Sequence, residues 1–268
     1  MPFVQANGIS IYYEIGGSGN PVLFISGTGA DLRVKPNVLD GPLAKQKRVL
    51  AFDQRGLGQT EKPRTQYEME DYADDAAALL VALNWQKVDV IGVSFGGMVA
   101  LHLALRHAHL INRLVLCCTS PGGEFGSYPF HELPSNLSPL ERIVQLMPVN
   151  DTRRDAAWQK RNPEFVERAI QYAKDHEVAE HSSPEYQESA KRQVDARSRH
   201  DVVARLGDIS HETLICAGKY DGIAPAENQE VLHKGIKHAQ MRWFEGGHLF
   251  LNQDKSAIQE ILSFLSST

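Results

Sequence analysis

Cysteine and long apolar segments are both scarce in this chain of 268 residues. There are three cysteines, Cys117, Cys118 and Cys216, and an odd number argues against a disulfide framework. All three lie in apolar, strand-like runs, which is typical of small buried side chains rather than reactive thiols. No run approaches the roughly 18 apolar residues that a membrane span needs. The sequence therefore predicts neither a disulfide-stapled domain nor a membrane protein.

An excess of basic charge is also missing. Lysine and arginine total 28 against 33 acidic residues, for a net charge of -5. Domains that bind nucleic acid concentrate basic residues on one surface, so no nucleic-acid partner is expected. Residues 1–17 (MPFVQANGISIYYEIGG) lack the basic and then apolar segments of a signal peptide, which favours a cytoplasmic location. With 42% hydrophobic residues, the composition is that of an ordinary globular protein.

Short apolar runs alternate with helical patterns over most of the chain. A hairpin is expected around Asn7-Gly8, because Asn-Gly suits a two-residue turn. Further runs of strand length are continuous enough for strands buried on both faces. They span residues 21–26, 48–53, 88–93, 113–118, 212–218 and 240–246. Helical patterns span residues 69–83, 97–107, 226–234 and 256–265. This alternation predicts an α/β fold with a mostly parallel sheet.

Residues 121–208 interrupt the alternation, because they contain no convincing strand. Helical segments are expected at 139–147, 152–160, 163–177 and 184–199, and several of them open with proline. We therefore expect residues 121–208 to form a helical insertion, not an independent domain. The core would then consist of residues 1–120 and 209–268.

A serine lies at a predicted strand–turn–helix junction in VDVIGVSFGGM, residues 88–98. Here Gly92-Val93-Ser94-Phe95-Gly96 matches the pattern G-x-S-x-G. Glycines two residues before and after Ser94 let the strand and helix backbones pass each other at a sharp bend. That bend holds the hydroxyl out at the carboxyl edge of the sheet. The alternative is a glycine-rich turn with an incidental serine, and we interpret Ser94 as a nucleophile.

A serine nucleophile needs a general base and an acid that orients the base. Asp221 lies in the turn after the run at 212–218, and His248 lies in a Gly-Gly-His turn after the run at 240–246. Both are expected at the same sheet edge as Ser94, in the chain order Ser, Asp, His. We interpret three other histidines as packing or surface residues: His102, His107 and His109. Four more lie in the insertion, where they face solvent or a substrate: His131, His176, His181 and His200.

Metal and cofactor motifs are incomplete. His131-Glu132 begins like H-E-x-x-H, but the second histidine is missing. Gly27-Thr28-Gly29 begins like a dinucleotide fingerprint, but it lacks the third glycine, and Pro36 interrupts any following helix. We therefore expect neither a metal nor a cofactor.

These residues together resemble the α/β-hydrolase superfamily over nearly the whole chain. The resemblance rests on GVSFGG around Ser94, YDGIAP around Asp221, GGH at His248, and DQRGLGQT at residues 53–60. It implies an eight-stranded, mostly parallel sheet with helices on both faces and the insertion as a cap. GTGADLR at residues 27–33 is similar to the bacterial esterase and 3-oxoadipate enol-lactonase branch.

The resemblance also implies an oxyanion hole. Its donors would be the backbone N–H groups of Thr28 and Phe95. Members of the superfamily usually carry histidine where this chain has Ser26, so the packing at that position must differ. Ser26 is one candidate for the substrate pocket. Aromatic residues of the insertion are the others, with core packing as the alternative role: Phe125, Tyr128, Phe130 and Trp158.

The predicted activity is hydrolysis of a small ester or lactone through an acyl-enzyme. The alternatives are cleavage of a C–C bond in a vinylogous diketone, perhydrolase or haloperoxidase-like activity, and a ligand receptor on the same fold. The expected partner is a small-molecule substrate, and nothing in the sequence indicates an oligomeric state. Five arginines of the insertion are candidates for holding a substrate carboxylate, with a solvated helix face as the alternative: Arg142, Arg153, Arg154, Arg161 and Arg168.

Overall fold

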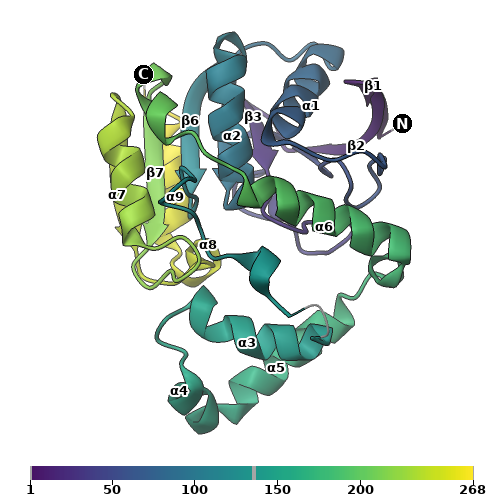
Figure 1. Ribbon diagram of the computed structural model, residues 1–268. Helices are drawn as coiled ribbons and strands as arrows, with labels where there is room; N and C mark the ends of the chain where they lie inside the picture. The colour runs from purple at the N-terminus through teal and green to yellow at the C-terminus, as the bar shows by residue number, and fades with distance from the viewer. Residues whose placement is uncertain (1, 135–136, 268) are drawn as a thin grey trace.

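An eight-stranded sheet runs through the centre of the protein in the computed structural model, which describes residues 2–134 and 137–267 (Figure 1). Its strands are β1 (Phe3–Ala6), β2 (Ile9–Gly16), β3 (Pro21–Ile25), β4 (Arg48–Phe52), β5 (Val88–Val93), β6 (Ile111–Cys117), β7 (Thr213–Gly218) and β8 (Ala239–Phe244). They lie in the order β1-β2-β4-β3-β5-β6-β7-β8. The β1–β2 and β2–β4 pairs are antiparallel, and the others are parallel. The predicted mostly parallel, eight-stranded α/β fold is confirmed.

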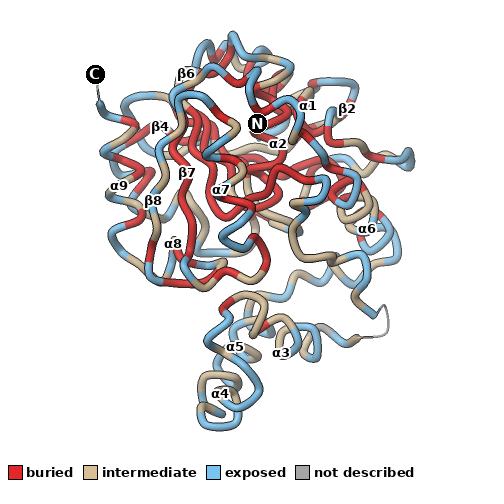
Figure 2. The backbone as a smooth tube through the Cα atoms, turned by 60° about the vertical axis from the view of Figure 1, so that its left-hand side comes forward, coloured by how far each residue is buried: buried red, intermediate tan, exposed pale blue. Residues whose placement is uncertain are grey.

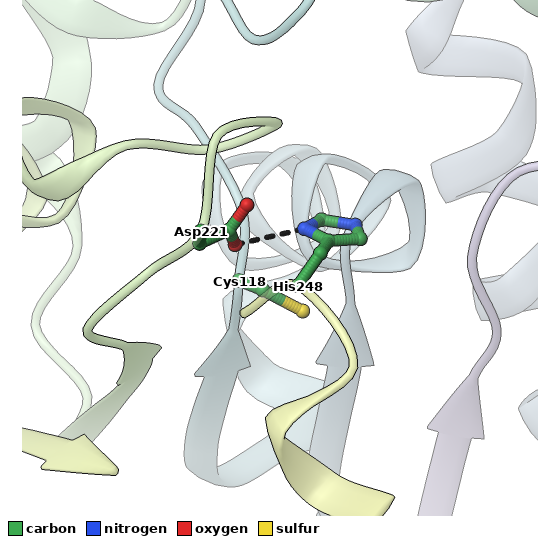
Figure 3. Close-up of side chains that lie close together, drawn as sticks. All are labelled: Cys118, Asp221 and His248. Carbon is green, nitrogen blue, oxygen red and sulfur yellow. Dashed lines mark hydrogen bonds and ion pairs between the residues drawn. The ribbon is translucent and has the colours of Figure 1, made fainter. Parts of the chain in front are cut away.

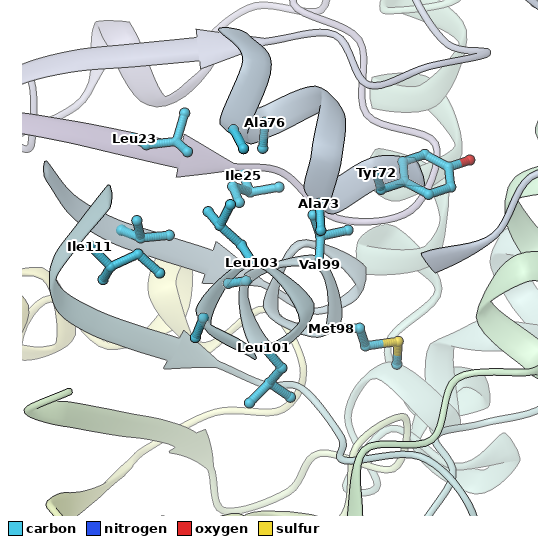
Figure 4. Packing of buried hydrophobic residues seen from close by; sticks show 14 of the residues in the cluster. Leu23, Ile25, Tyr72, Ala73, Ala76, Met98, Val99, Leu101, Leu103 and Ile111 are labelled. Atoms are coloured by element: carbon cyan, nitrogen blue, oxygen red, sulfur yellow. The ribbon is translucent and has the colours of Figure 1, made fainter. Parts of the chain in front are cut away.

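Helices cover both faces of this sheet. The helices of the core are α1 (Met69–Ala82), α2 (Phe95–Arg106), α7 (Ala226–Gly235), α8 (Phe250–Gln253) and α9 (Ser256–Phe264). Successive strand residues point to opposite faces. Leu23 joins the buried cluster beneath α1, α2 and α7, whereas Val22 joins the cluster beneath α9. Figure 4 shows the first cluster, in which Leu23 and Ile25 of β3 lie close to Ala73 and Ala76 of α1.

The chain between β6 and β7 is helical, as expected. Its helices are α3 (Pro139–Asn150), α4 (Ala156–Arg161), α5 (Pro163–Asp175) and α6 (Pro184–Ser198). Short 3-10 turns span η3 (Phe130–Glu132), η4 (Ala179–Ser182) and η5 (Val203–Asp208), and in the core η1 (Val38–Asp40) and η2 (Ala108–Leu110). α4 begins later than the sequence predicts, because the Asp155 side chain accepts the Trp158 N–H at 2.7 Å and caps the helix there.

The two ends of this helical segment meet. The Val202 N–H donates to the Pro121 carbonyl at 2.9 Å, and the Gly123 N–H donates to the His200 carbonyl at 3.1 Å. The segment therefore leaves and rejoins the sheet at one place. We propose that residues 121–208 are a cap on the core formed by residues 1–120 and 209–268.

Burial is uneven between these two parts. Figure 2 shows buried backbone concentrated in the sheet, while the lobe formed by α3, α4 and α5 is mostly exposed or intermediate. Helices α4 and α5 contain no fully buried residue. All three cysteines are buried and free. Within the described residues, every helix is too short or too polar to cross a bilayer.

Candidate active site

Ser94 lies at the sharp turn between β5 and α2. Its backbone has φ 54° and ψ −117°, a conformation that L-residues rarely adopt. Two glycines permit the close approach around it. A Cβ on Gly92 would collide with the Gly96 backbone, and a Cβ on Gly96 would collide with the Ile25 carbonyl of the neighbouring strand. The turn therefore holds the Ser94 side chain at the carboxyl edge of the sheet.

Asp221 and His248 lie beside Ser94, although they come from distant parts of the chain. His248 Nε2 is 2.9 Å from Ser94 Oγ, and His248 Nδ1 is 2.8 Å from Asp221 Oδ2. The Asp221 carboxylate accepts a hydrogen bond from Nδ1–H, which leaves Nε2 without a proton and able to take the serine proton. The three side chains thus form one hydrogen-bonded chain that can carry a proton away from Ser94.

The Asp221 carboxylate is held in one orientation. Its second oxygen, Oδ1, accepts the backbone N–H groups of Ile223 at 2.8 Å and Ala224 at 2.9 Å. Asp221 is 6% exposed, so these two bonds replace water for the buried charge. Both carboxylate oxygens are therefore hydrogen-bonded, Oδ1 to the backbone of its own turn and Oδ2 to His248.

A loop rich in backbone donors faces Ser94. A Cβ placed on Gly27 would lie 3.6 Å from Ser94 Cβ, so the 26–29 segment passes directly beside the serine. The N–H groups of Thr28 and Phe95 donate to no acceptor within residues 2–134 and 137–267. Phe95 begins α2, and the first N–H groups of a helix have no acceptor within the helix. Two free donors beside a serine are what a tetrahedral oxyanion needs.

The chain also matches a known protein family. A family model described as the alpha/beta hydrolase fold matches residues 20–254. The chain belongs to the α/β-hydrolase fold family.

Curated relatives of this α/β hydrolase include two enzymes of similar length. The chain is 29% identical to a 2-hydroxymuconate semialdehyde hydrolase of Pseudomonas sp. strain CF600, over 91% of this chain and 86% of that protein. It is also 29% identical to a 2-hydroxy-6-oxo-2,4-heptadienoate hydrolase of Pseudomonas putida F1, over 98% and 95%. The enol-lactonase from Burkholderia xenovorans LB400 is 22% identical, with a TM-score of 0.80, over 99% of this chain and 100% of that one. The similarity to the enol-lactonase shows that the two proteins share a fold.

The DQRGLGQT segment of this hydrolase positions the loop beside Ser94. The Asp53 carboxylate accepts the Leu32 N–H at 2.8 Å and the Gln59 N–H at 2.9 Å, and Gln54 Nε2 donates to the Ser26 carbonyl at 2.9 Å. Burial raises the pKa of Asp53 to about 6, and the two backbone bonds oppose that shift. The segment thus links two strand ends and fixes the chain that carries Thr28.

Cys118 also lies at this site, but Asp221 and His248 are too close together for the three residues to bind a zinc ion as they stand. Figure 3 shows the Cys118 side chain beside Asp221 and His248. One possible metal-ligand atom from each of the three residues lies within 4.8 Å of the others. Nitrogen and oxygen ligands of a tetrahedral zinc sit about 2.0–2.2 Å from the ion, which places them more than 3 Å apart. The Asp221–His248 separation of 2.8 Å is too short for that and fits a hydrogen bond. Burial also raises the pKa of the Cys118 thiol, which disfavours a thiolate ligand.

The aromatic pocket candidates occupy different places. Tyr128 and Phe130 line a pocket of about 170 Å³ between α2 and α6. Phe125 lies in the same loop, where its carbonyl accepts from Asn228 at 2.5 Å. Trp158 lies on α4, where its ring packs edge-on against Phe165 at 5.2 Å, in the lobe far from the sheet (Figure 1).

Ser26 lines a second, larger pocket of about 900 Å³. Its lining includes Phe24, Ile91 and Val93 of the central strands, and also His248. The segment with η1 and the helix α9 form its sides. Ser26 thus lies between the loop beside Ser94 and an apolar groove on the face of the sheet opposite α2.

Two residues of α6 near the site were missed by the sequence reasoning. Gln193 Oε1 accepts the Gly29 N–H at 2.9 Å, and Arg197 lines the smaller pocket. None of the five arginines named as carboxylate candidates lines either pocket. Arg153 and Arg154, for example, pair with Asp151. The sequence predicted the helix from the proline at its start, and that signal does not indicate which face of the helix is buried.

Proposed function

We propose that this α/β hydrolase cleaves a small carboxylic ester or lactone through an acyl-enzyme on Ser94. The observation that carries this proposal is the hydrogen-bonded chain from Ser94 Oγ through His248 to Asp221, at a strained turn of the sheet. Strain of this kind costs about 1–3 kcal/mol and persists where the surrounding structure and function require it.

The geometry supports a two-step mechanism. Ser94 Oγ attacks the carbonyl carbon while His248 Nε2 takes the hydroxyl proton, and Asp221 stabilises the resulting imidazolium. The N–H groups of Thr28 and Phe95 donate to the tetrahedral oxyanion. When the C–O bond breaks, the leaving alkoxide takes the proton from His248. Water then attacks the acyl carbon, gives its proton to His248, and the acid leaves as Ser94 is reprotonated.

A C–C bond hydrolase is the second candidate. It is favoured by the two relatives that are 29% identical over most of this chain, whose names describe hydrolases of a semialdehyde and a dienoate. A panel of p-nitrophenyl esters and lactones, run beside a ring-fission dienoate, separates the two candidates. Turnover of the dienoate alone would replace the ester proposal with the C–C one.

The nucleophile is tested by substitution and labelling. We expect a fluorophosphonate probe to label Ser94 in the native protein, and Ser94→Ala to lower kcat by at least about 10³-fold. Ser263→Ala, at an exposed serine of α9, is the matched control and should keep full activity and labelling. Native protein that is not labelled, or full activity in Ser94→Ala, would reject the mechanism. Absence of both labelling and turnover in the native protein would favour a ligand receptor on this fold.

A further inference from the structure

The buried face of α6 is unusually polar. The helix buries five residues at a spacing of about one turn: Tyr186, Ser189, Gln193, Ala196 and Arg197. A helix normally turns an apolar stripe toward the core. Here most of the buried side chains carry polar atoms, and each of those atoms needs a partner when it leaves water.

Some of these polar atoms have partners and others do not. Ser189 Oγ bonds to the Tyr67 hydroxyl at 2.8 Å, and Arg197 Nη2 donates to Ser127 Oγ at 2.7 Å. Gln193 Nε2, Thr28 Oγ1, and both Nε and Nη1 of Arg197 are buried without a partner among the described residues. These unpaired atoms belong to the loop beside Ser94 and to two residues one turn apart on α6.

The charge of Arg197 is also uncompensated. Arg197 is only 6% exposed, and no carboxylate among the described residues forms an ion pair with its guanidinium. Burial lowers the pKa of Arg197 to about 10, and only the more distant Asp221 opposes that shift. The Asp221 oxygens are already used by its own turn and by His248.

The other neighbours of Arg197 cannot supply a negative charge. His200 Nε2 donates to the Ser120 carbonyl at 3.0 Å, so its Nδ1 accepts from His102 Nε2 at 3.1 Å, and the His200 ring is neutral in this arrangement. The Phe130 ring lies 4.2 Å from Arg197 Cζ and offers only a cation–π contact. The buried Arg197 guanidinium therefore has two nitrogen atoms, Nε and Nη1, without a hydrogen-bond acceptor and no negatively charged partner.

The space beside Arg197 is next to the candidate active site. The 170 Å³ pocket is lined by Arg197, His200, Ser120 and Met98, among others. Met98 is one turn beyond Ser94 on α2, and Thr119, next to Ser120, donates its hydroxyl to the Ser94 carbonyl at 2.7 Å. Clefts for whole ligands are usually about 300–1,000 Å³, so this pocket suits one end of a substrate.

We propose that Arg197 is a substrate-binding residue that takes a free carboxylate of the substrate, and so makes this enzyme selective for ester or lactone substrates that carry one. Gln193 contacts the loop beside Ser94, and Arg197 follows one helical turn later, about 6 Å along the axis. The proposal rests on the hydrolase function proposed above.

Two pairs of matched esters test this proposal and locate the carboxylate. The first pair is mono-4-nitrophenyl glutarate and 4-nitrophenyl butyrate, with the charge on the acyl side. The second is the butyrate ester of 4-hydroxybenzoate and that of 4-hydroxybenzamide, with the charge on the leaving group. We expect kcat/KM for the acid to exceed that for its neutral partner by about 10- to 100-fold in one pair, as a charged hydrogen bond allows.

The variants separate a binding role from a structural one. Arg197→Met should abolish the preference for the acid over its neutral partner, and Arg197→Lys should keep part of it. Arg199→Met is the control, because Arg199 lies at the same end of α6 but is exposed and pairs with Glu68. This control should keep the full preference.

Binding supplies a second readout that does not need turnover. Glutarate should raise the melting temperature of Ser94→Ala protein, and butyramide should not. The Ser94→Ala, Arg197→Met double variant should lose the glutarate effect. Preference for the neutral ester in both pairs, or a preference that survives in Arg197→Met, would overturn the carboxylate site. Absence of turnover and of Ser94 labelling would instead overturn the hydrolase function.

Discussion

At the scale of single residues, the candidate site depends on groups with only one usable orientation. Asp221 shows this most clearly, because one oxygen accepts two backbone N–H groups and the other faces His248 Nδ1. The carboxylate therefore sets the histidine tautomer as well as its position.

Asp221→Asn tests that role. The asparagine oxygen would take the two backbone N–H groups, which turns its NH₂ group toward the Nδ1 proton of His248. To avoid two donors facing each other, His248 must shift its proton to Nε2 and lose its ability to accept from Ser94. We expect kcat/KM to fall by about 10³- to 10⁴-fold while the melting temperature changes little. Activity within tenfold of wild type would contradict the orientation inferred for Asp221.

His200 makes stability depend on pH. Burial first, and then the neighbouring His102, lowers the pKa of His200 to about 3. The unfolded chain takes up a proton at this residue below about pH 6.5, whereas the folded chain does so only near 3, so acid favours unfolding in that interval. This contribution is complete above pH 6.5, and about 2–3 kcal/mol of it is lost by pH 4.5.

Urea unfolding at pH 7.0 and 4.5 measures this effect. His200→Gln keeps a donor for the Ser120 carbonyl and an acceptor for His102, but it does not titrate. The variant should lose less stability on acidification than wild type does. His109→Gln, at an exposed histidine, controls for the loss of one imidazole. Equal acid sensitivity in wild type and His200→Gln would refute the assignment.

At the scale of elements, the end of α3 joins the two loops that carry Asp221 and His248. The Gly222 N–H donates to the Val149 carbonyl at 3.0 Å, and the His248 N–H donates to the Asn150 carbonyl at 2.6 Å. The Thr152 N–H donates to the Tyr220 carbonyl at 2.9 Å. Residues 149–152 thus hold the turn that carries Asp221 and the turn that carries His248 at a fixed separation.

Gly247→Ala tests this contact. A Cβ at Gly247 would collide with the Asn150 carbonyl and lie 2.7 Å from Asp151 Cα, so the turn must move away from α3 and take His248 with it. We expect kcat to fall about 10²-fold, the loss that a displacement of roughly 1 Å produces. Gly207→Ala is the control, because a Cβ there meets nothing within 4 Å. An unchanged kcat in Gly247→Ala would show that α3 does not position His248.

The element α6 shows where sequence patterns stop being informative. Its existence follows from Ser183 and Pro184 at its start, and the Ser183 side chain does cap the helix through the Tyr186 N–H at 3.2 Å. Its buried face could not be read in the same way. Gln193 and Arg197 look like surface residues in a polar helix, and hydrophobic periodicity does not detect a polar face that is buried.

At the scale of the whole molecule, residues 121–208 depend on the sheet and its helices for their burial. Helices α4 and α5 bury no residue fully, whereas Tyr186 and Ala196 of α6 are buried where that helix meets the rest of the protein. A segment with so little core of its own does not offset the entropy lost on ordering its backbone.

We therefore predict that residues 121–208, expressed alone, will not unfold cooperatively. Circular dichroism should show a broad, shallow thermal change in the fragment and a sharp transition in the full chain. A sharp, two-state transition in the isolated fragment would mean that the segment is an independent domain. That result would contradict the cap proposed here.

The sequence by itself determined the alternation of strands and helices, the turn at Ser94, and the order of the three residues that meet there. These features depend on local chemistry: apolar periodicity, glycines that relieve a close backbone approach, and turns after strand ends. Tertiary structure alone decided which polar residues face the site. The Gly29–Gln193 and Ser127–Arg197 contacts join residues 164 and 70 positions apart. Whether a polar side chain is buried depends on what packs over it, and only the folded chain determines that.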